Sequence, residues 1–87
     1  MKVEWREFAL DQLADSFVAS DLETHDRIER AVMTINATLA LDPWTQGESR
    51  SSLNRRSWFV DPVTVLYEIF PTDDLVVVQH MAIRRSR

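Results

Sequence analysis

Three apolar runs rich in β-branched residues occupy the second half of the chain. They cover residues 56–60, 63–70 and 75–83, and short breaks at Asp61-Pro62 and at residues 71–74 separate them. Valine, isoleucine and aromatic residues favour extended strands, whereas proline and aspartate favour the turns between strands. The pattern predicts a three-stranded antiparallel meander.

Alternation within these runs predicts which side chains face the core. In the middle run the more uniformly apolar set should pack against helices, namely Val63, Val65, Tyr67 and Ile69. In the last run the odd positions from Leu75 to Ile83 oppose the even positions from Val76 to Arg84, so that His80 and Arg84 share a face. Both faces of this run are largely apolar, which is typical of a central strand or of a strand that a partner covers.

The first half of the chain changes to a helical period after a short alternating start. The start of the chain predicts a short half-buried strand, because apolar residues are set among charged ones: Val3, Trp5 and Ala9 fall among Lys2, Glu4, Arg6 and Glu7. Residues 8–19 carry an apolar stripe on one side and polar residues on the other, as an amphipathic helix does. A second helix should begin near residue 22, with Ser20 or Asp21 as its cap, and end at Asp42-Pro43.

The polar stretch 44–52 is the one long connection, and a length of about ten residues makes it a candidate functional loop. The elements together predict an α+β fold with an N-terminal strand, a two-helix hairpin and a three-stranded antiparallel meander. We expect the helices to pack on one face of a four-stranded antiparallel sheet. A chain of 87 residues has room for a single domain, which we expect to span residues 1–87.

Composition excludes several kinds of chemistry. The chain contains no cysteine, which rules out disulfides, thiol catalysis and thiolate metal sites. Its two distant histidines and scattered carboxylates provide no metal-ligand spacing, so we expect no metal and no cofactor. No apolar run approaches the ~20 residues of a membrane span, and the N-terminus lacks the apolar core of a signal peptide. We therefore expect a cytoplasmic protein with no membrane partner.

Charge is divided unevenly between the two halves of the chain. Residues 1–49 contain four basic and ten acidic side chains, whereas residues 50–87 contain six arginines and four acidic side chains. The arginines flank the meander, and we expect the function to lie where its two ends meet: Arg50, Arg55 and Arg56 at the entry, and Arg84, Arg85 and Arg87 at the exit.

The use of arginine without lysine in this half favours bidentate pairing with phosphate or carboxylate groups. One interpretation is that the arginines bind an RNA backbone, with the contacts made by Arg50, Arg55, Arg56 and Arg85. The other interpretation is that they solvate the strand ends and pair with the acidic helices.

His80 is the candidate for proton transfer, because histidine is the side chain that titrates near neutral pH. Arg84 on the same face or Glu68 on the neighbouring strand could orient its ring. Arg84 would in turn stabilise the charge that develops during phosphodiester cleavage, which makes His80 and Arg84 the candidate catalytic pair. The alternative interpretation of His80 is a partly buried structural histidine.

The order of the elements and several local motifs resemble the RelE/ParE toxin superfamily of bacterial toxin–antitoxin systems. The resemblance spans nearly the whole chain. The matching segments are Trp5 and residues 9–13, the helix 28–39 followed by Leu41-Asp42-Pro43, Gly47-Glu48-Ser49-Arg50, Val65-Leu66-Tyr67-Glu68-Ile69, and residues 76–85.

This resemblance implies a compact toxin that a cognate antitoxin protein neutralises. The RelE-like branch cleaves mRNA on the ribosome, and the ParE-like branch inhibits DNA gyrase without being a nuclease; a homodimer is a further option. In the cleaving branch, Arg55 and Arg56 would be the basic residues of the first meander strand. The basic role at the last strand would fall to Arg84, Arg85 or Arg87.

Two departures from the cleaving pattern favour a non-catalytic alternative. Thr64 stands where the cleaving branch has an arginine, and the chain carries no terminal tyrosine. The alternative is a toxin-like binding module, either a gyrase inhibitor or a relative that only binds its antitoxin.

Overall fold

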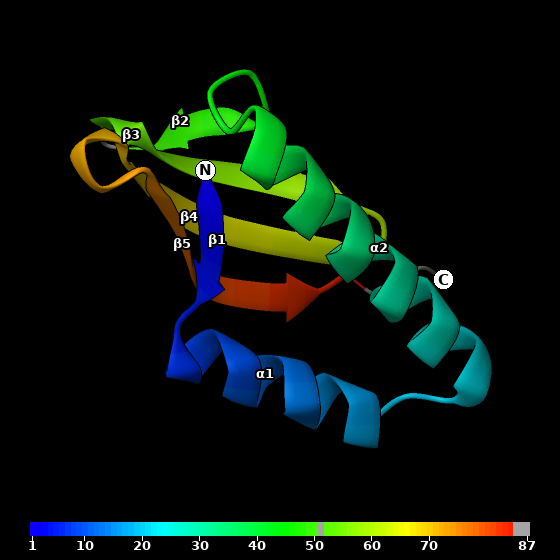
Figure 1. Ribbon diagram of the computed structural model, residues 1–87. Helices are drawn as coiled ribbons and strands as arrows, with labels where there is room; N and C mark the ends of the chain where they lie inside the picture. The colour runs from blue at the N-terminus through cyan, green and yellow to red at the C-terminus, as the bar shows by residue number, and fades with distance from the viewer. Residues whose placement is uncertain (51, 85–87) are drawn as a thin grey trace.

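The computed structural model describes residues 1–50 and 52–84, which form two helices on one side of a five-stranded sheet (Figure 1). The elements follow one another as β1 (Lys2–Trp5), α1 (Glu7–Val18), α2 (Leu22–Leu41), β2 (Glu48–Arg50), β3 (Ser52–Val60), β4 (Val63–Phe70), the 3-10 turn η1 (Pro71–Asp73) and β5 (Leu75–Ile83). The predicted α+β class, the helix hairpin and the meander of β3, β4 and β5 are confirmed.

The sheet has one strand more than predicted and is mixed rather than antiparallel. Its strand order is β1-β5-β4-β3-β2, and β1 runs parallel to β5. The additional strand is β2, which forms within the stretch 44–52 and folds back on β3. β2 could not be predicted from the sequence, because residues 48–50 are polar and exposed and show no apolar alternation. An edge strand can form through backbone hydrogen bonds alone. The sequence of β1 does not indicate whether this strand runs parallel or antiparallel to β5.

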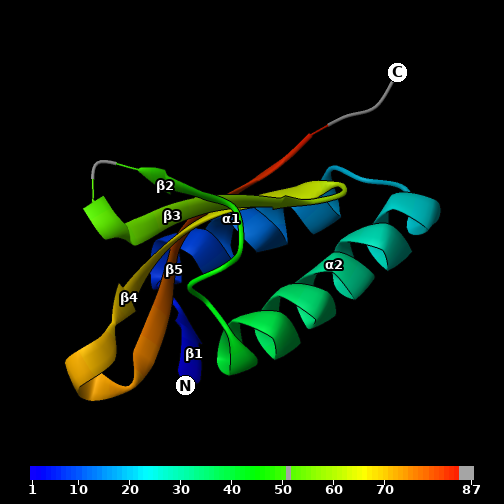
Figure 2. The ribbon, with the colours of Figure 1, turned by 90° about the horizontal axis from the view of Figure 1, so that it is seen from above.

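The two helices end close to the predicted residues, and the structure decides between the two candidate caps. The Asp21 carboxylate accepts the Thr24 backbone N–H at 2.8 Å, which makes Asp21 the N-cap of α2. The Ser20 hydroxyl instead donates to the Ser16 carbonyl at 2.6 Å, at the end of α1. As Figure 2 shows, α2 crosses the sheet obliquely, while α1 runs along the β5 edge.

The core lies between the helices and the inner face of the sheet. The inward set predicted for β4 is confirmed, since Val63, Val65, Tyr67 and Ile69 are fully buried. From the helices the core receives Ala9, Ile28, Ala31, Ile35 and Leu39.

Strict alternation along the whole of β5 is wrong. Leu66 of β4 pairs with His80 and Tyr67 pairs with Val78, so that Gln79 is an extra residue in a β-bulge. Val76 and Val78 before the bulge and Met81 after it therefore all face the core. Because His80 and Arg84 both follow the bulge, they still share the outer side of the sheet.

Candidate functional site

The face of the sheet turned away from the helices, here called the outer face, carries most of the candidate chemistry. β3 and β4 contribute alternate residues to it, and Arg55 pairs with Glu68 while Phe59 pairs with Thr64. No helix among the described residues covers this face (Figure 2). Side chains at its centre are therefore accessible to a large ligand.

A hollow of about 380 Å³ lies on the outer face near the end of β5. Its lining residues come from β2, β3, β4, the loop before β2 and the end of β5, and the set is called the outer hollow: Gly47, Glu48, Arg50, Ser57, Phe59, Thr64 and Arg84. The guanidinium carbon of Arg84 lies 4.7 Å from the centroid of the Phe59 ring, which is a cation–π arrangement. Phe59 thus holds the Arg84 side chain at the hollow.

Arg50 is the second cation of the outer hollow, and Glu48 beside it moderates its charge. Arg50 Nη2 lies 3.8 Å from the Glu48 carboxylate, and both side chains are largely exposed. An exposed ion pair at this separation is worth little, about 0–1 kcal/mol. The hollow therefore presents two guanidinium groups, two hydroxyl residues and an aromatic ring to one ligand.

Arg56 and Tyr67 fix the loop that forms one wall of the outer hollow. Arg56 donates to the Gln46 carbonyl at 2.7 Å, to the Ser49 hydroxyl at 3.0 Å and to the Gly47 carbonyl at 3.2 Å. The Tyr67 hydroxyl donates to the Pro43 carbonyl at 2.7 Å and lies 3.2 Å from the Gln46 carbonyl. Burial raises the pKa of Tyr67, although the nearby Arg56 charge opposes this shift. Arg56, predicted as an RNA contact, therefore has three protein acceptors.

Gly47 lets this loop pass close to β3. Its φ of +62° is left-handed, and a Cβ at this position would lie 2.1 Å from the Ser57 carbonyl oxygen. Only glycine fits both requirements. The sequence contains a single glycine, and it stands at the wall of the outer hollow.

Arg55 forms an ion pair with Glu68 on the outer face. Its Nη2 atom lies 3.5 Å from Glu68 Oε1, and Gln79 donates to the same carboxylate oxygen at 2.9 Å. Glu68 is thus committed to two neighbours and is not placed to orient His80. The bulge at Gln79 brings this amide to Glu68, a contact that the sequence pattern could not indicate.

His80 lies apart from the outer hollow, at the start of α1. Its ring meets the Phe8 ring edge-on, with the centroids 5.1 Å apart, and among the described residues it has no hydrogen-bond or ion-pair partner. His80 and Arg84 are separated by four residues of extended chain, about 13 Å along the backbone. The structure does not bring the predicted catalytic pair together around one phosphate.

The two ends of the meander do not meet, contrary to the expectation from the sequence. Two successive reversals of direction make β3 and β5 run the same way, so the start of β3 and the end of β5 lie at opposite ends of β4. Arg55 and Arg84 are therefore far apart, while Arg50 and Arg84 both line the outer hollow. Arg85 lies outside the described residues. Phe59 was missed because an aromatic residue in a strand is first assigned to the core.

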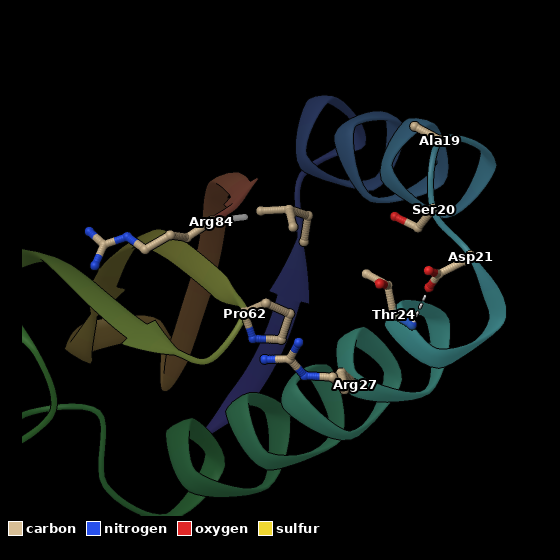
Figure 3. A pocket seen from close by; sticks show the side chains of 8 residues that line it. Ala19, Ser20, Asp21, Thr24, Arg27, Pro62 and Arg84 are labelled. Carbon is tan, nitrogen blue, oxygen red and sulfur yellow. Dashed lines mark hydrogen bonds between the residues drawn. The ribbon is translucent and has the colours of Figure 1, made fainter. Parts of the chain in front are cut away.

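A second pocket lies between the helix hairpin and the end of the sheet (Figure 3). Its volume is about 250 Å³, and Ser20, Asp21, Thr24, Arg27 and Ile83 are among its lining residues. The polar groups of this pocket already have partners, since the Asp21 carboxylate accepts the Thr24 backbone N–H and Arg27 forms an ion pair with Asp61. In Figure 3 the Arg84 guanidinium points away from this pocket. The outer hollow is therefore the stronger candidate for an anionic ligand.

Residues 1–50 and 52–84 contain no group of three histidine, aspartate or glutamate side chains that could hold a metal ion. No helix in the same ranges is long and apolar enough to cross a membrane.

Comparison with known proteins identifies the fold. No protein-family profile matches the sequence, and no curated protein matches it either. The structure, however, superimposes on a chain of the toxin–antitoxin complex RelBE2 from Mycobacterium tuberculosis with a TM-score of 0.73. The match covers 98% of this chain and 92% of that chain at 16% sequence identity. The chain has a RelE-like toxin fold.

Identity of 16% establishes the fold and carries no residue-by-residue roles. The residues that act must therefore be argued from the geometry of this chain.

Proposed function

We propose that this protein is the toxin of a type II toxin–antitoxin system and that it binds RNA, in particular mRNA on the ribosome, through the outer hollow. A cognate antitoxin protein would neutralise it, and the ribosome would place its action in the cytoplasm. The observation that carries the proposal is that Arg50, and Arg84 with its guanidinium over the Phe59 ring, line one hollow on an uncovered sheet face. The RelE-like toxin fold supports it independently.

The chemistry of the outer hollow suits a single RNA strand. Guanidinium groups contact phosphates, and the hydroxyls of Ser57 and Thr64 can contact the ribose or phosphate oxygens. A base can stack on an aromatic ring, which is worth about 1–3 kcal/mol per base in single-strand binding. The overall charge of −4 opposes binding of a polyanion, and the acidic residues concentrate in the first half of the chain, which forms the helical layer.

The proposal extends to cleavage of the bound RNA, in which Arg84 would stabilise the charge that develops on the scissile phosphate. A nucleophilic 2'-hydroxyl needs no metal, but it needs a group that accepts its proton. His80 could accept this proton only if the bound RNA placed its 2'-hydroxyl within hydrogen-bond reach of the imidazole ring. The same separation of His80 from Arg84 favours a second candidate function, a non-catalytic toxin that blocks its target, such as gyrase, by binding.

An RNA-binding measurement tests the proposal. We expect the wild-type protein to bind a fluorescent single-stranded RNA, and we expect Arg84→Ala to weaken binding about 5- to 20-fold and to lower the salt slope by about one unit. Arg30→Ala is the matched control, because Arg30 is an exposed arginine on α2, in the helical layer. Equal losses from both variants would mean that the outer hollow is not the RNA site.

Cleavage and binding are then separated with purified ribosomes and gyrase. Ribosome-dependent cuts in mRNA that disappear in Arg84→Ala support the nuclease. Inhibition of gyrase supercoiling without such cuts supports the second candidate and contradicts the RNA proposal.

A further inference from the structure

Helix α1 exposes an apolar stripe that the fold does not use. Three apolar residues follow one another at four-residue spacing and are all exposed, and they are called the apolar stripe: Leu10, Ala14 and Val18. The exposed fractions of Leu10 and Val18 are 48% and 88%. Residues four apart lie on the same side of a helix, so these side chains form one continuous strip.

The packing of α1 is already complete without this stripe. Ala9 is fully buried, and Leu13 and Phe17 pack against the core. On its other flank Gln12 accepts the Met81 backbone N–H at 3.0 Å, which anchors α1 to the edge of β5. Single exposed apolar residues are ordinary, but an aligned row on a short helix marks an interaction surface.

A row of carboxylates runs beside the apolar stripe. Its members are also four residues apart and are called the acidic stripe: Glu7, Asp11 and Asp15. Helix α1 contains no lysine or arginine, and within residues 1–50 and 52–84 none of the three carboxylates forms an ion pair. Their charges are therefore available to a partner.

We propose that α1 is the docking surface for a basic amphipathic segment of a partner protein, which is the antitoxin if the function proposed above is correct. Apolar side chains of that segment, spaced three or four residues apart, would cover Leu10, Ala14 and Val18. Lysine or arginine side chains beside them would meet the acidic stripe. The two segments would meet as packed helices do, through an apolar seam flanked by complementary charges.

A second copy of the chain is a poor occupant for the same surface. Two α1 helices packed stripe to stripe would bring like charges together, because each carries three carboxylates and no cation, and like charges opposed in this way destabilise an interface. The location also separates this surface from the outer hollow, so one partner could bind α1 while RNA binding is measured on the other face.

A synthetic peptide provides the first test. The probe is an amphipathic helical peptide with leucines at four-residue spacing and lysines beside them, and the comparison peptide carries glutamate in place of lysine. We expect the full-length protein to bind the lysine peptide, as measured by fluorescence anisotropy, and to leave the glutamate peptide unbound. Binding should weaken between about 0.05 and 0.5 M salt, because screening shortens the reach of surface charges.

Matched variants locate the binding surface. Asp11→Lys with Asp15→Lys should weaken binding of the lysine peptide roughly tenfold or more, because two attractive pairs become repulsive. The control double variant, Glu23→Lys with Asp26→Lys, makes the same charge change on exposed residues of α2 and should alter binding less than about twofold. For the apolar stripe, Val18→Ser should weaken binding, whereas Met33→Ser on α2, where Met33 is 65% exposed, should not.

The outcomes are distinguishable from those of the proposed function. Failure of the lysine peptide to bind, equal binding of both peptides, or equal losses in the test and control variants overturns the docking surface. Dimerisation in solution that Val18→Ser abolishes would also overturn it, in favour of a second copy. If the protein binds the lysine peptide but neither binds RNA nor is toxic, the docking surface is supported and the proposed function is rejected. Circular dichroism of each variant confirms that it is folded.

Discussion

The Tyr67 hydroxyl is the most informative single group to remove, because it connects the core to the loop that walls the outer hollow. Tyr67 is fully buried. Its hydroxyl donates to the Pro43 carbonyl at 2.7 Å, and Pro43 is itself a buried residue. Tyr67→Phe deletes this donor and changes the shape of the core very little.

The size of the effect follows from which carbonyls lose their donors. The Gln46 carbonyl keeps its hydrogen bond from Arg56 at 2.7 Å, so that only the Pro43 carbonyl is left without a partner. A buried acceptor without its donor costs about 1–3 kcal/mol, and a single neutral acceptor belongs in the lower half of that range. We expect Tyr67→Phe to lower the free energy of unfolding by about 1.5 kcal/mol. The corresponding fall in Tm is about 6–12 °C for a domain of this size.

Chemical denaturation and amide hydrogen exchange measure this prediction. Urea titration gives the change in free energy, and exchange should accelerate at residues 44–47 before it does so in β4. Thr64→Val is the control on the same strand, since Thr64 makes no hydrogen bond that fixes the loop, and it should change stability by less than about 0.5 kcal/mol. A loss below about 0.3 kcal/mol in Tyr67→Phe, with unchanged exchange at residues 44–47, would refute the reasoning.

Three further predictions concern the loop and the pH dependence of stability. Gly47→Ala should destabilise the protein by about 1–3 kcal/mol, as measured by urea titration, because its Cβ would meet the Ser57 carbonyl oxygen at 2.1 Å; unaltered stability would contradict the tight approach. Burial raises the pKa of Tyr67, so the contribution of this shift to the free energy of unfolding is complete below the unfolded pKa of about 10 and is lost as the pH rises through the folded pKa. Tyr67→Phe should therefore lose less Tm at alkaline pH than the wild type does. Hydrogen bonds from Thr24 lower the pKa of Asp21, so the helix cap stabilises the fold fully above about pH 4 and less as the pH falls through the folded pKa. Asp21→Ala should have a lower Tm than the wild type at pH 7, and the difference in Tm between the two proteins should shrink in acid.

The sequence predicted the fold where periodicity was strong. The four inward residues of β4, the helix ending at Asp42-Pro43 and the hairpin of helices all follow from local pattern. β2 and the bulge at Gln79 could not be predicted, because backbone pairing decides both and leaves no apolar signal.

The candidate site was predicted less well than the fold, because the roles of arginines depend on contacts distant in sequence. Arg50 and Arg84, from strands that are not neighbours, both line the outer hollow. Arg55 is bound by Glu68, and Arg56 holds the loop through Gln46, Gly47 and Ser49. Four arginines of similar appearance in the sequence thus have three different environments.

The central claim is that a RelE-like toxin acts through Arg84 on its outer face. The most direct measurement is bacterial growth after induced expression of the wild type, Arg84→Ala and the control Arg30→Ala, at equal protein levels. We predict that the wild type and Arg30→Ala arrest growth and that Arg84→Ala does not. Arrest of equal strength by Arg84→Ala, or normal growth with the wild type, would contradict the account.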